Sequence, residues 1–535
     1  MRSLLLMCLI LVVDLVTADT YPRNESIDIK HYAFRLHLND TTDIIAGEAT
    51  VQLRIVKPIS DFELDLVNQN AQKMGMRVEG VWMDGKEIQF SHQNNRLKIV
   101  LPTEVGINQH ISVTIRYNGI PADGLIISTN MYGDRTFFGD NWPDRARNWL
   151  PCIDHPYDKA RVDFIVTAPH HYTVVGNGVK EEESFLNPKQ KLTHWHEEVD
   201  LPTKVMVIGV ARFAIRYEAN VDNISVESWV FPQNRDEGFR DYAPATRILE
   251  FFNNHIGPYS YKKLANVQST TIYGGMENAS NIFYYEKSVT GKGGIDNLIA
   301  HEIAHQWFGN SASEKDWHHV WLSEGFATYF AHVYNEFTYG KARLAEGLAN
   351  DRQSVVAYCR KSPAPIINTA TTDYKQLLTA HVYARASWVL HMLRREIGDE
   401  AFWKGIREYY RTYQNSNAMT ADLQVIMERV SDKDLELFFR QWLNRAPLPA
   451  LKMSWSYDQK RKTVRVTVDQ AQKDELFNLP LELAIEYGTT GNGKRTEKVR
   501  ISQKTTTFGF KSESKPVKIV LDPGINLLFE DLSKN

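Results

Sequence analysis

Two histidines in this sequence have the spacing of metal ligands in a hydrolase. His301 and His305 bound the pentapeptide HEIAH, inside an apolar stretch from 297 to 308 that has helical spacing. Residues four apart lie one turn above each other on one face of a helix, so both imidazoles can reach one metal ion. Asp296 is placed to cap the start of this helix and Gly309 to end it.

A carboxylate that completes the ligand set follows after eighteen intervening residues. Glu324 lies in the segment WLSEG at 321–325, which we expect to begin a second helix. Two histidines and one glutamate suit catalytic zinc, one ion per chain, with a fourth position left for water. Zinc lowers the pKa of such a water from about 16 to about 7. Glu302 is then the general base that takes the proton of this water and later protonates the leaving amine.

Three nearby residues have less certain roles. His318 and His319 are adjacent and therefore point in different directions, so we interpret them as loop residues or supports of the ligands rather than ligands. Asp316 is a candidate for orienting a ligand histidine, and the sequence leaves that assignment open. For the pentapeptide alone, a helix with two surface histidines is a serious alternative. The presence of Glu324 on its own helix disfavours that alternative.

The period of the apolar pattern indicates which elements position these residues. From 19 to 216 apolar residues alternate with polar ones, which predicts an antiparallel β domain. Examples of this alternation are Ala49, Val51, Leu53 and Ile55, and Ile111, Val113, Ile115 and Tyr117. From 217 to 445 the period lengthens toward 3.6, which predicts a mainly helical domain with a long helical stretch from Ala386 to Tyr413.

A third domain follows the helical region. Pro447 and Pro449 end the helices, and Val464, Val466 and Val468 then alternate with polar residues. We expect residues 446–535 to form a small β-sandwich. The predicted fold class is a multidomain α+β protein in the order β, α, β.

Composition narrows the function classes. The 535 residues suggest several domains, and 62 basic against 65 acidic side chains give a net charge of -3. This charge creates no field that would attract nucleic acid, so no nucleic-acid partner is expected. Of three cysteines, Cys8 lies in the N-terminal leader, and Cys152 and Cys359 are far apart in the sequence. No disulfide framework is expected.

The N-terminus has the pattern of a signal peptide. Arg2 precedes an apolar run from Leu4 to Val13, and small residues follow up to Ala18. The run is too short to span a bilayer, so we expect residues 1–18 to be cleaved and no stable membrane span to remain. The expected location is secreted or periplasmic. Glycosylation sequons lie at Asn24, Asn39, Asn223 and Asn278. They suit a eukaryotic secretory route but also arise by chance, so bacterial export fits equally.

A segment before the zinc helix resembles a known motif. The residues GGMEN at 274–278 resemble the exopeptidase motif of gluzincin aminopeptidases, the family of aminopeptidase N and leukotriene hydrolase. Together with the zinc residues and LPCID at 150–154, the resemblance spans the first two domains. It implies a thermolysin-like catalytic domain between the two β domains. It also implies that Glu277 binds the free α-amine of a peptide substrate, a charge that an internal peptide bond lacks.

The same resemblance implies further contacts with substrate. The motif backbone is expected to lie along the peptide as an extra strand, with glycines allowing close approach. The expected substrate-binding residues are Gly274, Gly275, Met276, Glu277 and Asn278. Tyr383, in the segment VYARAS at 382–387, resembles the family tyrosine that stabilises the oxyanion, although this match is looser than the others. The chain departs from many relatives with Arg385 and Ala386, where lysine and glycine are common.

Two other departures concern substrate choice. Relatives usually carry a glutamine or glutamate in the first domain, where this chain has Asn141 and Trp142. Asn141 is a candidate for a weaker amide contact and Trp142 for a wall of the first pocket. Ninety residues follow Arg445, where many relatives add a large helical domain. We therefore expect a short form with a more open cleft.

The predicted function is a zinc-dependent aminopeptidase that acts on peptides with a free N-terminus. The alternatives are an endopeptidase or epoxide hydrolase on the same fold, and a non-catalytic scaffold. Glu277 argues against an endopeptidase, and nothing in the sequence favours a lipid epoxide. The scaffold is disfavoured because every ligand and the general base are present.

Overall fold

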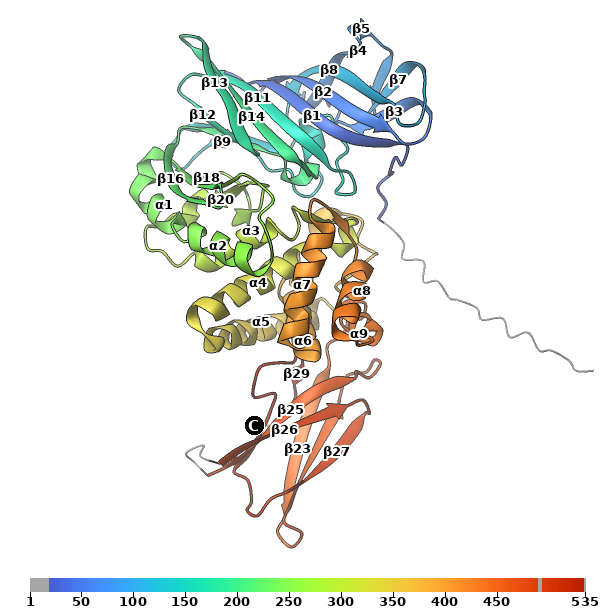
Figure 1. Cartoon of the computed structure of the whole chain (residues 1–535), viewed down its shortest axis with the longest axis vertical. Helices are drawn as coiled ribbons and strands as arrows, with labels where there is room; N and C mark the ends of the chain where they lie inside the picture. Colours follow the sequence, from blue (N-terminus) through green and yellow to red (C-terminus); the bar gives the residue numbers. More distant parts are fainter. Residues whose placement is uncertain (1–18, 489–492, 534–535) are drawn as a thin grey trace, which may run out of the picture.

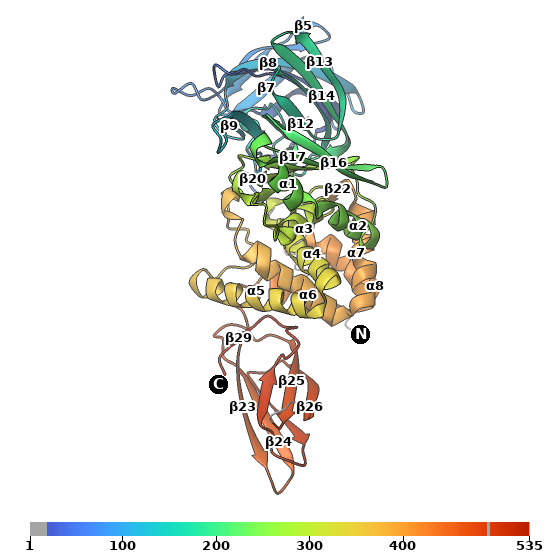
Figure 2. The same ribbon diagram turned by 90° about the vertical axis from the view of Figure 1, so that its left-hand side faces the viewer.

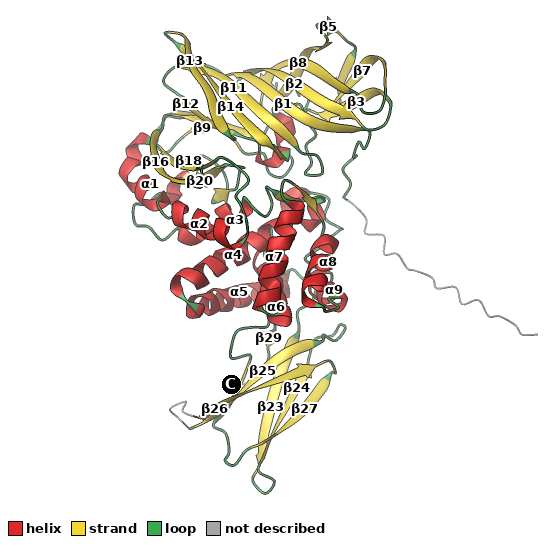
Figure 3. Cartoon of the chain, in the orientation of Figure 1, coloured by secondary structure: helices red, strands yellow, loops and turns green. Residues whose placement is uncertain are grey.

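The computed structural model describes residues 19–488 and 493–533, and the predicted signal peptide lies outside them. Figure 1 shows three tiers along the long axis, with strands at both ends and helices between them. Colouring by secondary structure makes the order β, mainly helical, β plain (Figure 3). This confirms the predicted order of the parts. No helix among the described residues has the length and apolar character needed to cross a membrane.

The N-terminal tier is built around one large sheet. Its order is β13-β14-β11-β1-β2-β8-β4-β5, and β1 pairs with β11 in parallel while the other neighbours are antiparallel. The strands are β1 Ile27–His37, β2 Ile45–Ile55, β4 Gly75–Met83, β5 Lys86–Glu87, β8 His110–Ile120, β11 Ala160–Pro169, β13 Val179–Asn187 and β14 Gln190–Leu201. The predicted alternation is confirmed in β2 and β8, where the named apolar residues are all buried.

Two smaller sheets complete this tier. One has the order β3-β7-β6, and the other has the order β12-β15-β10-β9. Their strands are β3 Ile59–Asp65, β6 Phe90–Gln93, β7 Arg96–Val105, β9 Leu125–Thr129, β10 Arg135–Gly139, β12 Thr173–Gly176 and β15 Ile208–Ala211.

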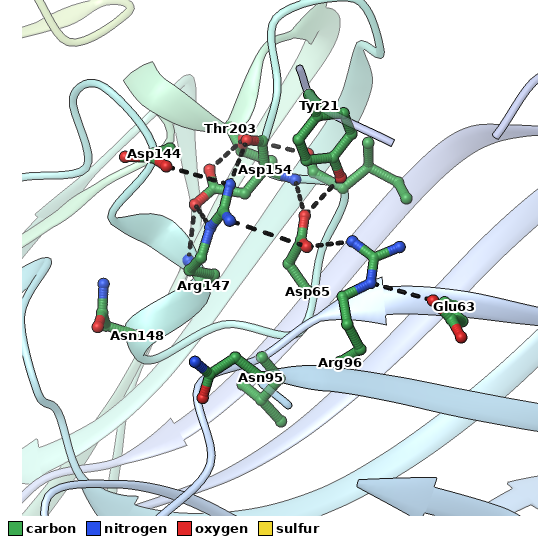
Figure 4. Close-up of polar contacts among 12 residues, drawn as sticks. Tyr21, Glu63, Asp65, Asn95, Arg96, Asp144, Arg147, Asn148, Asp154 and Thr203 are labelled. Atoms are coloured by element: carbon green, nitrogen blue, oxygen red, sulfur yellow. Dashed lines mark hydrogen bonds and ion pairs between the residues drawn. The ribbon is translucent and has the colours of Figure 1, made fainter. Parts of the chain in front are cut away.

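The segment LPCID is held in place by buried charges. Asp154 accepts hydrogen bonds from Arg147 Nε (3.1 Å) and from Thr203 Oγ1 (2.9 Å), and its own main-chain nitrogen donates to Asp65 Oδ2 (2.9 Å) (Figure 4). Cys152 pairs with Asp65 through the backbone, and its thiol is free and buried. Because Asp154 is completely buried, these partners are needed to compensate its charge. They fix this segment against the end of β3.

The middle tier begins with a mixed sheet of the order β16-β17-β18-β20-β19. Its strands are β16 Ala214–Val221, β17 Ile224–Val230, β18 Lys263–Ser269, β19 Gly275–Met276 and β20 Asn281–Tyr285. The predicted domain boundary between 216 and 217 falls inside β16. Since β16 pairs with β17 from Ala214 onward, the whole strand belongs to this second sheet.

Helices form the rest of the middle tier, together with a short β21–β22 pair. The elements are α1 Arg235–Tyr242, α2 Ala245–His255, α3 Asp296–His305, β21 Ala312–Glu314, α4 Trp321–Tyr339, α5 Lys341–Lys361, α6 Ala386–Ile397, α7 Asp399–Tyr413, β22 Ser416–Ala418, α8 Thr420–Ser431 and α9 Glu436–Leu443. The predicted single stretch from Ala386 to Tyr413 is wrong, because Gly398 at φ +87° separates α6 from α7. A positive φ breaks the helical repeat, and glycine adopts it without steric cost.

The zinc helix differs from the prediction at both ends. Asp296 makes no capping hydrogen bond at the start of α3 and instead lies against Arg247 of α2. The predicted cap is therefore wrong. The helix ends at His305, and turns continue to Gly309, whose φ is +115°.

The C-terminal tier contains two sheets, of orders β27-β24-β23-β29 and β26-β25-β28. The strands are β23 Ala450–Asp458, β24 Thr463–Gln470, β25 Leu479–Tyr487, β26 Gly493–Ile501, β27 Thr505–Lys511, β28 Lys518–Leu521 and β29 Glu530–Asp531. The alternating valines of β24 are buried as expected. Helix α5 lies next to this tier (Figure 2) and is tied to it by an ion pair of 2.5 Å between Arg352 and Asp522.

Candidate metal and substrate site

The three predicted metal ligands converge on one point. His301 and His305 project from α3, and Glu324 projects from the first turn of α4. The Nε2 atoms of the histidines are 3.1 Å apart, and Glu324 Oε2 lies 3.5 Å from His301 Nε2 and 3.2 Å from His305 Nε2. Tetrahedral zinc with bonds of about 2.05 Å holds its ligand atoms about 3.3 Å apart. The donor atoms therefore have the separation that zinc requires.

The buried carboxylates of the site also favour a bound cation. Glu324 Oε2 is buried and accepts no hydrogen bond from the described residues. Burial by itself lowers the pKa of His305, but the carboxylates of Glu324 and Glu277 outweigh this and raise the pKa to about 10. Glu277, Glu302 and His305 also lie within 4.8 Å of one another through their ligand atoms. Buried carboxylates that attract a proton this strongly fit a site for a divalent metal ion.

The second ring nitrogen of His305 is held by residues behind the ligands. With Nε2 turned toward the other ligands, Nδ1 carries the proton and faces Phe308 O (3.2 Å) and Ser323 Oγ (3.0 Å). Gly309 permits this contact, because a Cβ there would lie 2.1 Å from Ser323 Oγ. Ser323 therefore fixes the ring orientation, a role that the sequence did not reveal.

Asp316, His318 and His319, whose roles the sequence left open, form hydrogen bonds with residues other than the ligand histidines. Asp316 accepts hydrogen bonds from the main-chain nitrogens of Asp19 and His318, both at 2.9 Å. His318 Nε2 contacts Thr371 O at 3.1 Å, and His319 Nδ1 contacts the hydroxyl of Thr420 at 2.7 Å. These contacts fix the turn that leads into α4. The orienting contact to His305 comes from Ser323 instead.

The general-base candidate is pressed against the exopeptidase motif. A Cβ on Gly275 would lie 2.2 Å from Glu302 Oε1, so only glycine leaves room for this carboxylate. Burial raises the pKa of Glu302 well above its usual range, His305 lowers it, and Glu277 and Glu324 raise it further. A raised pKa makes the ionised carboxylate a stronger base than an ordinary glutamate.

The motif itself forms an edge strand. Within the described residues, β19 is the last strand of its sheet, with β20 on one side and no strand on the other. Gln306 Nε2 and Asn310 Nδ2 both donate to Glu277 O, at 2.8 Å and 2.6 Å, and so fix the backbone after the strand. Glu277 Oε1 is buried without a hydrogen-bond partner among the described residues. The edge and this free carboxylate oxygen are both available to a ligand.

Tyr383 reaches the same site from a distant part of the chain. It lies in a π-helical turn, His381–Arg385, directly before α6, and its ring centre is 6.0 Å from that of His301. Burial raises its pKa well above the usual range, and Glu324 and Glu277 add to that effect. Its phenol therefore keeps its proton and can donate a hydrogen bond.

A cavity of about 260 Å³ joins these groups. It is lined by Trp142, Tyr273, Gly274, Gly275, Met276, Glu277, Leu298, His301, Glu302, His305, Glu324, Leu378 and Tyr383. Asn278 is completely buried and is not among the lining residues. The sequence reasoning missed Tyr273, Leu298 and Leu378, although Leu298 stands three residues before His301 on the same helix, a spacing that places both on one face.

Of the two first-domain candidates for substrate contact, Trp142 lines the cavity and Asn141 does not. Trp142 walls the cavity as expected. Asn141 is completely buried and donates to Thr203 O (3.2 Å) and Met206 O (2.6 Å), while its Oδ1 accepts from Trp149 Nε1 (2.8 Å). Its amide is thus already satisfied by the protein. The suggested amide contact to substrate is therefore wrong.

Comparison with known proteins agrees with this arrangement. Residues 29–205 match the peptidase M1 N-terminal domain and residues 241–442 match the peptidase family M1 domain. The chain is 25% identical over 481 residues to a leucyl aminopeptidase of Saccharolobus solfataricus, covering 83% of this chain and 57% of the relative. It is 29% identical over 312 residues to aminopeptidase N of Rattus norvegicus, covering 54% of this chain and 32% of the relative. The chain thus spans only part of the length of these relatives.

A solved structure has the same fold. The M1 zinc metallopeptidase of Deinococcus radiodurans superimposes with a TM-score of 0.69 at 24% identity, covering 79% of this chain and 95% of that one. The two family matches together cover the β domain and the domain that holds the convergent His301, His305 and Glu324. This chain therefore belongs to peptidase family M1, the gluzincin family that includes aminopeptidase N.

Proposed function

We propose that this chain is a zinc-dependent aminopeptidase that removes single residues from the N-terminus of peptides. The observation that carries the proposal is the buried, unpartnered Oε1 of Glu277 in the same cavity as the metal ligands. A carboxylate in that position suits a substrate ammonium group, which the N-terminus of a peptide supplies. The aminopeptidase names of the relatives point the same way.

In this proposal the residues divide the chemistry between them. His301, His305 and Glu324 hold one zinc ion, which when bound supplies a Lewis acid and a water of lowered pKa. Glu302 takes the proton of the attacking water and delivers it to the leaving amine. Tyr383 donates a hydrogen bond to the carbonyl oxygen as negative charge develops on it.

The substrate backbone pairs with the free edge of β19. An extended peptide added there gains main-chain hydrogen bonds, and Glu277 fixes its register by binding the α-amine. The first side chain then lies near Trp142 and Tyr273. We further infer that the middle tier has a thermolysin-like arrangement and that the two C-terminal sheets form a β-sandwich.

The test compares one short peptide with a free and with an acetylated N-terminus, with and without a chelator, and follows products by mass. The expected result is chelator-sensitive loss of one residue at a time from the free peptide only. The variant E277Q is expected to lose most of this activity while keeping its zinc. Internal cleavage of the acetylated peptide would show an endopeptidase instead. No cleavage of any peptide in a broad library by the zinc-bound protein would favour a scaffold.

We also propose that the protein is exported and that cleavage after Ala18 makes Asp19 the first residue. Asp19 is buried, and its nitrogen lies 2.9 Å from Asp316 Oδ2. A free α-amine at this place would be a cation facing a carboxylate, which supports the proposed cleavage site. The mass of the mature secreted protein tests it, since any other N-terminus contradicts the proposal.

A further inference from the structure

Three histidines surround one aspartate on one face of the N-terminal sheet, and none of these four residues lines the cavity described above. Asp163 of β11 lies 2.6 Å from His31 Nε2 of β1, and 2.8 Å from both His194 Nε2 and His196 Nδ1 of β14. One ligand atom each from His31, Asp163 and His196 lies within 4.8 Å of the other two. The side chains are partly exposed, at 14% for Asp163 and 33% for His196.

The sheet register gathers these side chains. Asp163 stands directly opposite His196 in the antiparallel β11–β14 pair. In the parallel β1–β11 pair, His31 stands opposite the residue two before Asp163, so both point to the same face. Alternate residues on these strands, such as Phe164 and Trp195, are buried on the other face. The geometry therefore belongs to the fold and does not depend on a loop.

Hydrogen bonds satisfy part of this cluster, because Asp163 Oδ1 lies 2.8 Å from both His194 Nε2 and His196 Nδ1, and His31 is the imidazole left without such a bond in the described chain. The Nε2 atom of His31 is buried and makes no well-directed hydrogen bond within the described residues, although Asp163 Oδ2 is only 2.6 Å away. Partial burial acts to raise the pKa of Asp163, but the three imidazoles outweigh it and hold the pKa well below its usual range. These contacts favour the ionised form of the Asp163 carboxyl, which is the form that binds metal ions.

We propose that His31, Asp163 and His196 form a second metal site, for Zn²⁺ or a similar divalent transition metal, with His194 as a further ligand or support. Two imidazoles and a carboxylate are the same donor types as in the cavity. A metal ion here would join β1, near the start of the described chain, to β11 and β14. The second metal site takes no part in the proposed peptidase reaction and would stabilise the N-terminal domain.

The test is equilibrium dialysis of the full chain against Zn²⁺, with zinc per chain measured by mass spectrometry. The wild type is expected to bind a second equivalent, and H196A and D163N are expected to bind it at least tenfold more weakly. H110A, which removes an exposed histidine of β8 outside the cluster, should keep both equivalents. H301A should lose the cavity ion and retain the second one, so the two sites are scored separately.

A second readout does not depend on counting ions. Zn²⁺ above the first equivalent should raise the melting temperature of the wild type and of H110A by a few degrees and leave that of H196A unchanged. Peptidase activity at one equivalent should be the same in all three proteins. The proposal is overturned if the wild type, H196A and D163N bind zinc identically, or if H301A binds none.

Discussion

At the scale of single residues, the position of Glu302, the proposed general base, depends on Gly275 having no side chain. Changing Gly275 to alanine would place a Cβ 2.2 Å from Glu302 Oε1 and push the carboxylate aside. We expect G275A to lose about 100-fold in kcat, because a displacement of about 1 Å has that cost at a reacting group. Zinc content should stay unchanged. Activity assays and metal analysis of the purified variant check both.

The neighbouring glycine is a matched control. A Cβ on Gly274 would meet no atom of the described residues within 4 Å, and its φ is not in the left-handed region. G274A should therefore retain kcat within a few-fold. Equal losses in G274A and G275A would mean that the motif backbone, and not Glu302, is sensitive to substitution.

The variant S323A tests whether the hydroxyl of Ser323 supports His305 as a metal ligand. S323A removes the partner 3.0 Å from His305 Nδ1 and should weaken zinc binding by about 10- to 100-fold. Competition with a chelator measures this affinity. Ser311 is the control, because its hydroxyl is also buried but bonds Asn415 at 2.9 Å, away from the ligands. S311A should bind zinc like the wild type.

At the scale of elements, the turn that carries Tyr383 is anchored by one arginine. Arg385 is completely buried and donates to Ala364 O (2.8 Å), Ala446 O (3.0 Å) and Arg445 O (2.6 Å). It thus ties the π-helical turn to the segment that leads toward the C-terminal strands. We regard Arg385 as a positioning residue for Tyr383.

The variant R385K should separate positioning from binding. Lysine cannot reproduce the fork of donors, so we expect loss of up to two hydrogen bonds and a fall in kcat of about tenfold, with KM and zinc affinity nearly unchanged. Kinetics at several substrate concentrations give the separation. Arg395 lies exposed on α6, and R395K should change none of these quantities. A rise in KM alone would argue against the positioning role.

At the scale of the whole molecule, a buried ion pair joins the first two tiers. Lys204 Nζ lies 2.5 Å from Glu314 Oε1, and both side chains are about 1% exposed or less. K204M would leave the buried carboxyl of Glu314 without its cationic partner, and we expect it to lower the free energy of unfolding by about 3–5 kcal/mol. The double variant K204M/E314L should recover much of this loss. Urea unfolding of both proteins measures it.

An exposed ion pair between the same tiers gives the comparison. Lys375 Nζ lies 3.1 Å from Asp123 Oδ2, with side chains 55% and 36% exposed. Solvent screens such a pair, so K375M should cost less than about 1 kcal/mol. A similar cost for K204M would mean that water reaches Lys204.

The buried Glu197 should make stability depend on pH. Burial raises its pKa to about 7, despite a hydrogen bond from Val199 and the charge of Lys263, while the unfolded chain has the usual value of 4.5. Between these values the folded state keeps a proton that the unfolded state releases. The free energy of unfolding therefore falls as pH rises through this window, by at most about 3 kcal/mol.

E197Q should remove that part of the pH dependence. We expect the melting temperature of the wild type to fall, relative to that of E197Q, between pH 5 and pH 8. Glu198 is exposed beside it, so E198Q should keep the wild-type slope. Parallel slopes for the wild type and E197Q would show that Glu197 is ionised in the folded protein.

The sequence by itself determined the parts of this protein that depend on local spacing. The four-residue interval between His301 and His305 places both on one helix face, and the alternation in β2 and β8 fixes which side chains are buried. The order of the three tiers follows from the change of apolar period along the chain. These features involve neighbours in the chain, so the repeat of a helix or a strand is enough to predict them.

Only the tertiary structure decided the features that join distant segments. The support of His305 by Ser323, the fit of Glu302 against Gly275 and the satisfied amide of Asn141 depend on how separate elements pack. The π-helical turn at Tyr383 overrides the local helical pattern in the same way, whereas the break at Gly398 has a local cause in the glycine itself. Side-chain contacts between elements are set by the packing of a close-filled interior, which no periodic pattern in one segment encodes.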